Sequence, residues 1–587
     1  QAIFSWPRER QGPRAAAPQP AGEANLGQGM AAACALARGA VARGPTVWTI
    51  QTGRTRSLSV TRILRAEKAT GPLAGLRVLD LSRILAGPSA TMLMADMGAT
   101  ITKVEALKTG DDTRRYAPPY IQADDGVDSD LAAYFTSCNR NKMSLALNFK
   151  DPEGQKVLFK LLETSDVLIE NFKTGTLDKY GLGFNQLKDR FPGLVYCSVT
   201  GFGHTGPYSK RPAYDMLIQA MGGSMSITGV PDGEPMKMGL SMFDLTAGLH
   251  AVIGILAAIR DKSITGLGQH VDISMLDVSV ALMQNQGMNY LAKKQRQPRV
   301  GNNHPNVVPY QVMPSQDGYF ILTASNDEQF GKFCKVAGRE DLLEDERFAT
   351  MRARVVHRGH VTPALNEITK TMETAWWLKK LELAGVGCAP ILHPDEVFAD
   401  PHVLSREMLI EMNVPGCKKP VSLIGSPMKF SRTKVNYRYA PPRVGEHSDE
   451  ILAEAGYTEQ QVAELRAGGA VGERPEVVGD DFVSQALNAR PVSFDELQAA
   501  KDAGSKSWAD VRSVSVPNAS AILADSKEKD ADHYIKTAPQ STHMLGRLHG
   551  STWDSVRSMS VPTAASMTGP KDPVKQLKVP KKRSTPA

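Results

Sequence analysis

Short apolar runs that alternate with segments of helical periodicity are the feature that most restricts the fold of this chain. LRVLDLS (76–82) predicts a buried strand, AGPSATMLMADMG (86–98) a helix and ATITKVE (99–105) the next strand. DVLIENF (166–172) and GLVYCSVTGFG (193–203) repeat the pattern, with a crossover between them. Strands joined by such crossovers run parallel, so the sequence predicts an α/β fold with a doubly wound sheet, whose ligands bind outside the carboxyl ends of the strands.

Two common nucleotide sites and a membrane span are not expected. The first strand-to-helix turn reads SRILAGPS and lacks G-x-G-x-x-G, and no G-x-x-x-x-G-K-[ST] occurs, which argues against NAD and ATP. The most apolar run, AGLHAVIGILAAI (247–259), is shorter than the roughly 18 residues that a spanning helix needs. We therefore expect this run in a core and no membrane partner.

The net charge of +7 is concentrated at the N-terminus. Residues 1–72 hold ten Arg and Lys against three Asp and Glu, and the remainder sums to zero. The main part of the chain has no overall basic bias, so nucleic acid is not an expected partner.

The N-terminal charge has the pattern of a targeting sequence. From Met30 the chain carries six Arg and no acidic residue before Glu67, and it is rich in Ala, Ser and Thr. This composition predicts a mitochondrial transit peptide over residues 30–68 and a matrix location, with a disordered basic tail as the alternative. Residues 1–29 are expected to be an unstructured extension. Six scattered cysteines without a C-x-x-C pair argue against disulfides or zinc and fit a reducing compartment.

The rest of the chain divides by composition. We expect a large domain formed by residues 73–290 and 401–470, and a small α+β domain at 291–400, which begins near the Gly-, Asn- and Pro-rich RVGNNHPNVVPYQ. Residues 471–587 predict a mostly disordered tail. It contains two copies of W-x-x-V-R-S-x-S-V-P, too few to build a stacked repeat fold.

Several blocks in order resemble the class III CoA-transferases (CaiB/BaiF type). They are GPLAGLRVLDLSRILAGPSATMLMADMGATITKVE, YFTSCNRNKMSLALNFKDPEG, ENFKTGTLDKYG, TGFGHTGPYSKRPAYDMLIQAMGG and GEHSDEIL, which together cover nearly all of residues 73–471. The resemblance implies a large Rossmann-like domain built from both ends of this region, a small domain from its middle and an interlocked homodimer. It also implies acyl-CoA and carboxylate substrates, coenzyme A as a cosubstrate, and no metal or permanently bound cofactor.

Asp244, in GLSMFDLTAGLHAVIG (239–254), is the expected nucleophile. Its local sequence alone predicts a helix N-cap, because an Asp before such a helix start commonly accepts backbone N–H groups. The resemblance implies that Asp244 attacks the acyl-CoA, and the two roles are compatible because a helix N-terminus favours a carboxylate anion. A carboxylate suits the reaction since it can become an anhydride and then a thioester.

The resemblance also implies where CoA binds. Lys150, Lys173 and Lys179 would meet its phosphates, with Leu85 and Ala86 at the first strand-to-helix turn. Lys179 stands where family members carry Arg, so a bidentate contact is not expected there. Arg114 is a further candidate for a phosphate or substrate carboxylate. The loop Gly301 to Pro305 is expected to cover the site, or else to be a linker.

Two alternative functions remain at this level. The α-methylacyl-CoA racemases share the fold but pair the equivalent Asp with a His about thirty residues earlier, where this chain has Tyr214, a poor match for the base. Asp215, next to Tyr214, is expected to be structural, with a role in orienting the site as the alternative. Within the family, the overall sequence is similar to that of mitochondrial members that move CoA from succinyl-CoA to glutarate, hydroxymethylglutarate and related dicarboxylates. The second alternative is a non-catalytic protein that binds partners through its tail.

Overall fold

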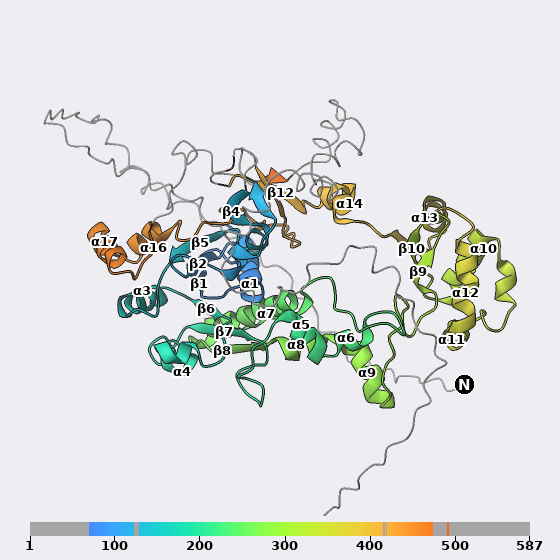
Figure 1. The fold of residues 1–587 in the computed structure, drawn as a ribbon, viewed down its shortest axis with the longest axis horizontal. Coiled ribbons are helices and arrows are strands. Elements are labelled where there is room, and N and C mark those ends of the chain that lie inside the picture. Colours follow the sequence, from blue (N-terminus) through green and yellow to red (C-terminus); the bar gives the residue numbers. More distant parts are fainter. Residues whose placement is uncertain (1–69, 123–127, 415–416, 418–419, 474–489, 492–587) are drawn as a thin grey trace, which may run out of the picture. The chain divides into compact units, whose positions relative to one another are not determined.

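The computed structural model describes residues 70–122, 128–414, 417, 420–473 and 490–491 (Figure 1). The predicted extension (1–29), the predicted transit peptide (30–68) and both tail repeats lie outside these residues.

A six-stranded sheet forms the centre of the fold, in the order β5-β2-β1-β6-β7-β8, and every neighbouring pair is parallel. The strands are β1 (Arg77–Asp80), β2 (Thr100–Glu105), β5 (Lys142–Ala146), β6 (Val167–Glu170), β7 (Val195–Thr200) and β8 (His270–Ser274). This confirms the predicted α/β fold. The strand order reverses between β1 and β6, and in such sheets ligands bind at the carboxyl ends beside this reversal.

Alternate side chains along the strands enter two apolar cores on opposite faces of the sheet. Val78 of β1 packs with α1 (Ala86–Asp96), α7 (Met242–Thr265) and α8 (Met275–Leu282), whereas its neighbour Leu79 belongs to the other core. The helical elements of that second core are α3 (Pro152–Leu162), η2 (Leu177–Tyr180), α4 (Phe184–Leu187), α16 (Ser448–Glu454) and α17 (Glu459–Ala467). Chain segments about 300 residues apart therefore share one core.

The C-terminal part of the described chain returns to the large sheet. Leu147, just after β5, forms a β-bridge with Val471, and the Asn148 N–H donates to the Ala470 carbonyl at 2.9 Å. β12 (Leu409–Met412) lies between β13 (Val421–Ile424) and β14 (Arg490–Pro491) in a separate antiparallel sheet.

A third apolar core extends from Val308 to Val386. It contains an antiparallel sheet of β9 (Tyr310–Pro314), β10 (Tyr319–Thr323) and β11 (Gly387–Pro390). Its helices are α10 (Asp327–Ala337), α11 (Met351–Val356), α12 (Arg358–Thr369) and α13 (Thr374–Leu383).

The remaining elements are η1 (Asp112–Arg115), β3 (Tyr120–Gln122), β4 (Asp128–Ala132), α2 (Ala133–Thr136), α5 (Asp215–Met221), α6 (Ser224–Ile227), α9 (Gln284–Lys293), η3 (Glu340–Leu343), α14 (Pro394–Ala399) and α15 (Pro401–Ser405).

Helix α7 is the one helix in the described part of the chain that is long and apolar enough, by length and composition alone, to cross a membrane. It is longer than the apolar run seen in the sequence. One side of it is buried against α1 and the sheet through Ala247, Ala251, Ile255 and Ala258. This packing accounts for the apolar residues on that side, which lie in the core as the sequence predicted. Leu249 and Ile253, on the other side of the same apolar run, are exposed instead.

Candidate active site

Asp244 lies in the first turn of α7, but it does not cap the helix. The N-cap position is Ser241, and the exposed backbone donors are met by Asp215, at the start of α5. Asp215 Oδ1 accepts from the N–H of Phe243 at 2.7 Å and from that of Asp244 at 3.2 Å. The capping role expected for Asp244 is therefore wrong, and the structural role expected for Asp215 takes this specific form.

The half-buried carboxyl of Asp244 has a pKa raised to about 7, first by burial and then by the charge of Asp215. Both causes disfavour the anion, so the carboxyl gains and loses its proton near neutral pH. A carboxylate with a raised pKa is more basic and more nucleophilic than an exposed one, which is a property expected of a reacting group.

One tyrosine, Tyr134, lies close enough to this carboxyl to feel its charge. Burial and then the charge of Asp244 raise the pKa of Tyr134, while the nearby side chain of Ser241 lowers it. Tyr116 meets Tyr134 edge to face with ring centroids 5.5 Å apart. A phenol next to a nucleophile can donate to a substrate oxygen. Sequence reasoning did not find Tyr134, because no local pattern distinguishes it from the other 13 tyrosines.

Helix α7 approaches the first turn of α1 at Gly248, one turn after Asp244. A Cβ on Gly248 would lie 2.6 Å from the Ala86 carbonyl oxygen, closer than any side chain tolerates. The glycine thus lets the two helix starts meet. The contact joins the turn that carries Leu85 and Ala86 to the helix that carries Asp244.

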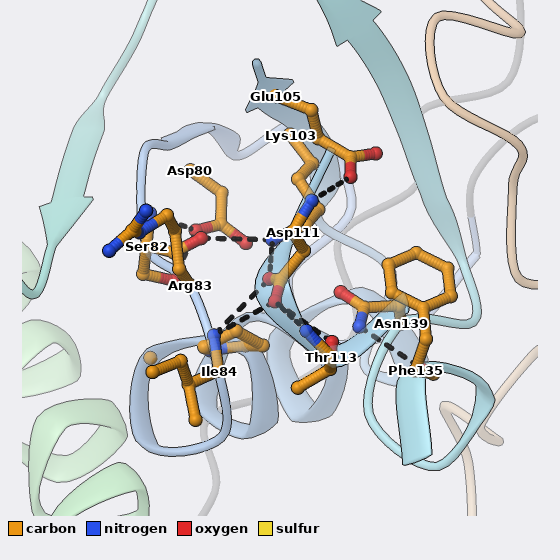
Figure 2. Close-up of polar contacts among 12 residues, drawn as sticks. Asp80, Ser82, Arg83, Ile84, Lys103, Glu105, Asp111, Thr113, Phe135 and Asn139 are labelled. Carbon is orange, nitrogen blue, oxygen red and sulfur yellow. Dashed lines mark hydrogen bonds and ion pairs between the residues drawn. The ribbon is translucent and has the colours of Figure 1, made fainter. Parts of the chain in front are cut away.

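The turn after β1 is held in a strained shape by a buried polar network (Figure 2). Ile84 has φ 69°, a rare value for a β-branched residue. Its N–H donates to both carboxylate oxygens of Asp111, at 3.1 and 3.3 Å, and Asp111 is ion-paired with the buried Lys103 at 2.9 Å. Lys103 and backbone donors keep the pKa of Asp111 low, at about 2, despite its burial. Strained backbone held by its surroundings is common at functional sites.

The same turn is tied to the segment after β6. The Arg83 N–H donates to Asn171 Oδ1 at 2.8 Å, and Asn171 Nδ2 donates back to the Arg83 carbonyl at 2.6 Å. Because β1 and β6 flank the reversal of strand order, this pair fixes the distance between the two loops there. Lys173 follows Asn171 by two residues.

A cavity of about 310 Å³ opens at the carboxyl ends of β1, β2 and β5. Its lining includes the rings of Phe149 and Phe172 and the cations Arg83 and Lys150. Aromatic walls beside cations suit a base with attached phosphates.

Lys179 belongs to η2, whose Tyr180 ring lies 5.8 Å from that of Phe149. Leu85, Ala86, Lys173 and Arg114 are not among the residues that line this cavity. Arg83 was not predicted from the sequence.

Arg114 is committed to the fold. Its guanidinium forms two hydrogen bonds with Glu105, at 2.9 and 2.7 Å, donates to the Pro442 carbonyl and stacks on Phe135 at 3.6 Å. The side chain is buried. These contacts favour a structural role over the ligand contact expected from the sequence.

The loop from Gly301 to Pro305 is anchored at both ends. Its Gly301 N–H donates to the Gly229 carbonyl at 3.0 Å, and Arg358 Nη2 donates to the carbonyls of His304 and Pro305 at 2.8 and 3.0 Å. These contacts define its base, and the covering of Asp244 by this loop stays a prediction.

A parallel sheet with a cavity at the carboxyl ends of its strands, and a carboxyl of raised pKa at a helix start, fit an α/β enzyme that uses a carboxylate as its reacting group. The family model "CoA-transferase family III" matches residues 73–448. This chain belongs to CoA-transferase family III, and it is a CoA-transferase that uses CoA thioesters as cosubstrates.

Similar proteins support this assignment. The succinate–glutarate CoA-transferase of Agrobacterium fabrum is 41% identical over 389 residues, which are 65% of this chain and 95% of that protein. The human succinyl-CoA:glutarate CoA-transferase is 38% identical over 401 residues, 68% of this chain and 90% of that protein. A crystal structure of a CaiB/BaiF family protein from Brucella suis aligns with a TM-score of 0.59 and 44% identity, over 66% of this chain and all of that one.

Proposed function

We propose that this protein transfers CoA from succinyl-CoA to a dicarboxylate such as glutarate or hydroxymethylglutarate, with Asp244 as the nucleophile. The observation that carries the proposal is that Asp244 does not cap its helix and has a raised pKa. Asp215 performs the capping, while burial keeps the Asp244 carboxyl near its protonation point at neutral pH. Both relatives named above have glutarate in their names, one together with succinate and the other with succinyl-CoA, which supports the choice of substrates.

The reaction needs a group that can hold the acyl unit and then CoA. The Asp244 carboxylate attacks the thioester carbonyl of succinyl-CoA, the C–S bond breaks, and CoA thiolate leaves an aspartyl–succinyl anhydride. The thiolate then attacks the aspartyl carbonyl, which releases succinate and forms an aspartyl-CoA thioester. The acceptor carboxylate attacks this thioester, and the released thiolate takes the acceptor acyl group from the second anhydride, which regenerates Asp244.

The neighbouring groups have defined tasks in this proposal. Tyr134 donates a hydrogen bond to the carbonyl oxygen under attack, where negative charge develops. Lys150 and Arg83, which line the 310 Å³ cavity, hold the CoA phosphates. The loop Gly301 to Pro305 excludes water from the anhydrides, which would otherwise be hydrolysed.

Chemical trapping tests the proposal directly. With succinyl-CoA present, hydroxylamine should convert activated Asp244 to a hydroxamate, seen by mass spectrometry of the peptide that contains residue 244. Glutaryl-CoA should form when glutarate is added. Asp244→Asn should give neither product while it still binds CoA. Exchange of the α-proton of a 2-methylacyl-CoA without an adduct would instead identify a racemase and contradict the proposal.

We also propose that two copies of this chain form the active enzyme. Large apolar side chains are exposed on four neighbouring helices, and they are Met216, Leu217 and Met221 of α5, Leu245, Leu249 and Ile253 of α7, Val280 and Leu282 of α8, and Met288, Tyr290 and Leu291 of α9. A surface of this kind marks an interaction site. The family resemblance of the sequence favours a second copy as its partner.

Residues 30–68 are proposed to direct the protein to the mitochondrial matrix. A fusion of residues 30–72 to a fluorescent protein should enter mitochondria. The same fusion with its six Arg changed to Gln should stay outside, because import depends on the positive face of such a segment. Equal import of both fusions would contradict the proposal.

A further inference from the structure

A second cavity, of about 280 Å³, lies near the sheet edge formed by β6, β7 and β8, apart from the cavity at β1, β2 and β5. Its floor is Glu170, which is 3% exposed at the end of β6. Oε2 of Glu170 accepts the Phe172 N–H at 2.8 Å, and Oε1 lies 3.9 Å from Nε2 of His204, beyond hydrogen-bond distance. The transfer chemistry described above makes no use of these groups.

Two buried polar atoms in the lining have no hydrogen-bond partner within the described part of the chain. They are Nε2 of His204 and Oγ1 of Thr174. Buried polar atoms are normally satisfied, and an orphan costs stability unless something else meets it. A neutral imidazole with its proton on Nδ1 accepts at Nε2, and a threonine hydroxyl also accepts. With Glu170, the cavity therefore offers three acceptors.

The walls are aromatic. Phe184 stacks on His270 with ring centroids 5.1 Å apart, and Tyr196 meets the same imidazole edge to face at 5.5 Å. His270 is held in place by Ser198, whose Oγ lies 2.9 Å from its Nε2. Such rings favour the apolar body of a ligand and attract a cation over their faces.

The charges around the floor are mainly negative. Asp178 and Asp272 both act on Glu170 and, after burial, help to raise its pKa to about 7. The groups that face Glu170 are Asp178 and Asp272, the imidazoles of His204 and His270, the Ser198 hydroxyl and, at the exposed rim, Lys173. A cation at the floor would relieve the repulsion between these carboxylates. An anionic ligand would add to it.

We propose that this cavity binds the ammonium group of a small primary amine. The ammonium donates its three hydrogen bonds to Glu170, Thr174 and His204, and the carbon chain packs on Phe184, Tyr196 and His270. A lone inorganic cation would leave most of the volume empty, since one water molecule takes only about 30 Å³. An organic amine of a few carbons takes up more of the volume and reaches the aromatic walls.

Calorimetric titration of the whole protein with n-propylamine tests the site. The probe should bind near pH 8, whereas n-propanol and butyrate should not, because they lack the charge or carry the wrong one. Tetramethylammonium has the charge but no N–H donor, so it should bind at least about tenfold more weakly. Absence of propylamine binding, or equal binding of butyrate or propanol, would overturn the proposal.

Variants locate the binding. Glu170→Gln keeps an acceptor for the Phe172 N–H and should weaken propylamine binding by about tenfold or more. Thr174→Val removes one acceptor with little change in shape and should weaken it several-fold. Thr164→Val, the same change at a residue outside the cavity lining, should have no effect. Unchanged affinity in both cavity variants would place the amine elsewhere and contradict the proposal.

The pH dependence gives a second readout. Because Glu170 must be ionised to accept from the ammonium and its pKa is about 7, binding near pH 6 should be several-fold weaker than near pH 8 and should release a proton. Glu170→Gln should remove the part of this dependence, and of the proton release, that comes from Glu170. Neither measurement involves CoA transfer, so failure here would leave the proposed function untouched.

Discussion

Asp244 lies at a helix start but does not cap it, because Asp215 accepts the backbone N–H groups there. Asp215 lies 29 positions earlier in the chain, yet its carboxylate satisfies the first donors of α7. This arrangement makes Asp244 harder to ionise, because burial of the site and the nearby charge of Asp215 both disfavour its anion. The folded state is therefore less stable with Asp244 ionised.

The sign of this effect can be tested. The folded pKa of Asp244, about 7, lies above its ordinary value of 3.8, so the folded protein binds a proton that the unfolded chain has lost. Its contribution is favourable below about pH 4 and is lost as pH rises to about 7. Asp244→Asn removes this loss and should stabilise the protein by about 1 to 3 kcal/mol near pH 8. Thermal unfolding near pH 8 and near pH 4.5 should show a larger gain at the higher pH; an equal gain at both would contradict this.

Substitutions at Lys150 and Arg114 should distinguish a residue that contacts the ligand from one that stabilises the fold. Lys150→Gln changes an exposed cation of the first cavity, so the KM for succinyl-CoA should rise several-fold with little change in stability. Arg114→Gln removes the ion-pair partner of the buried Glu105 carboxylate and should cost about 3 kcal/mol of stability. The checks are steady-state kinetics and denaturant unfolding. The reverse pattern would restore Arg114 as a ligand residue.

The residues also show which features of the candidate site could be predicted from the sequence. Asp244 was proposed as the nucleophile from the family resemblance, and this stays a prediction. Its expected role as the cap was wrong, because a local pattern does not record an acceptor on another helix. Arg114 was proposed as a ligand because nothing in TGDDTRR reveals that Glu105 and Phe135 enclose it. Charge and spacing identify candidates, whereas burial decides their role.

At the level of elements, strands with an apolar pattern were predictable and β5 was not. Lys142 and Ser144 interrupt its apolar residues, although every residue of this strand is buried. Lys142 is tolerated because its Nζ donates to the Pro88 carbonyl and Asn139 Oδ1, both at 2.9 Å, and lies 3.3 Å from the Asp80 carboxylate. Such a strand is specified by partners that are distant in sequence, which periodicity does not record.

The contact between α1 and α7 gives a prediction at this scale. Gly248→Ala would place a Cβ against the backbone of Ala86, which cannot rotate away as a side chain could. The helices should separate, with a loss of about 1 to 3 kcal/mol in stability and a fall in kcat as Asp244 moves. Gly287→Ala is the matched control, since the nearest atom to its Cβ lies at an ordinary 3.5 Å; it should be neutral or stabilising by up to about 1 kcal/mol. Equal effects in both variants would show that helix propensity, not the close approach, decides.

For the whole molecule, the exposed side of α7 needs an explanation that a single copy does not supply. Ile253 is 64% exposed and Leu249 is 48% exposed, one turn apart on a helix whose other side is core. If a second copy covers this side, the protein should sediment as a dimer at low micromolar concentration. Leu249→Asp with Ile253→Asp should then yield monomer or reduce dimer affinity at least about a hundredfold, because each buried carboxylate would lack a partner.

A matched control separates this effect from general damage. Leu383 and Val356 are 77% and 70% exposed in the part of the chain that has its own core, so Val356→Asp with Leu383→Asp adds the same charges elsewhere. This variant should remain dimeric. Circular dichroism of both variants distinguishes loss of pairing from loss of folding, and where the α7 variant fails to fold, Ile253→Ser alone gives a milder test by sedimentation velocity. A monomeric wild-type protein with full CoA-transferase activity would contradict the assembly and require that the apolar side of α7 serve another partner.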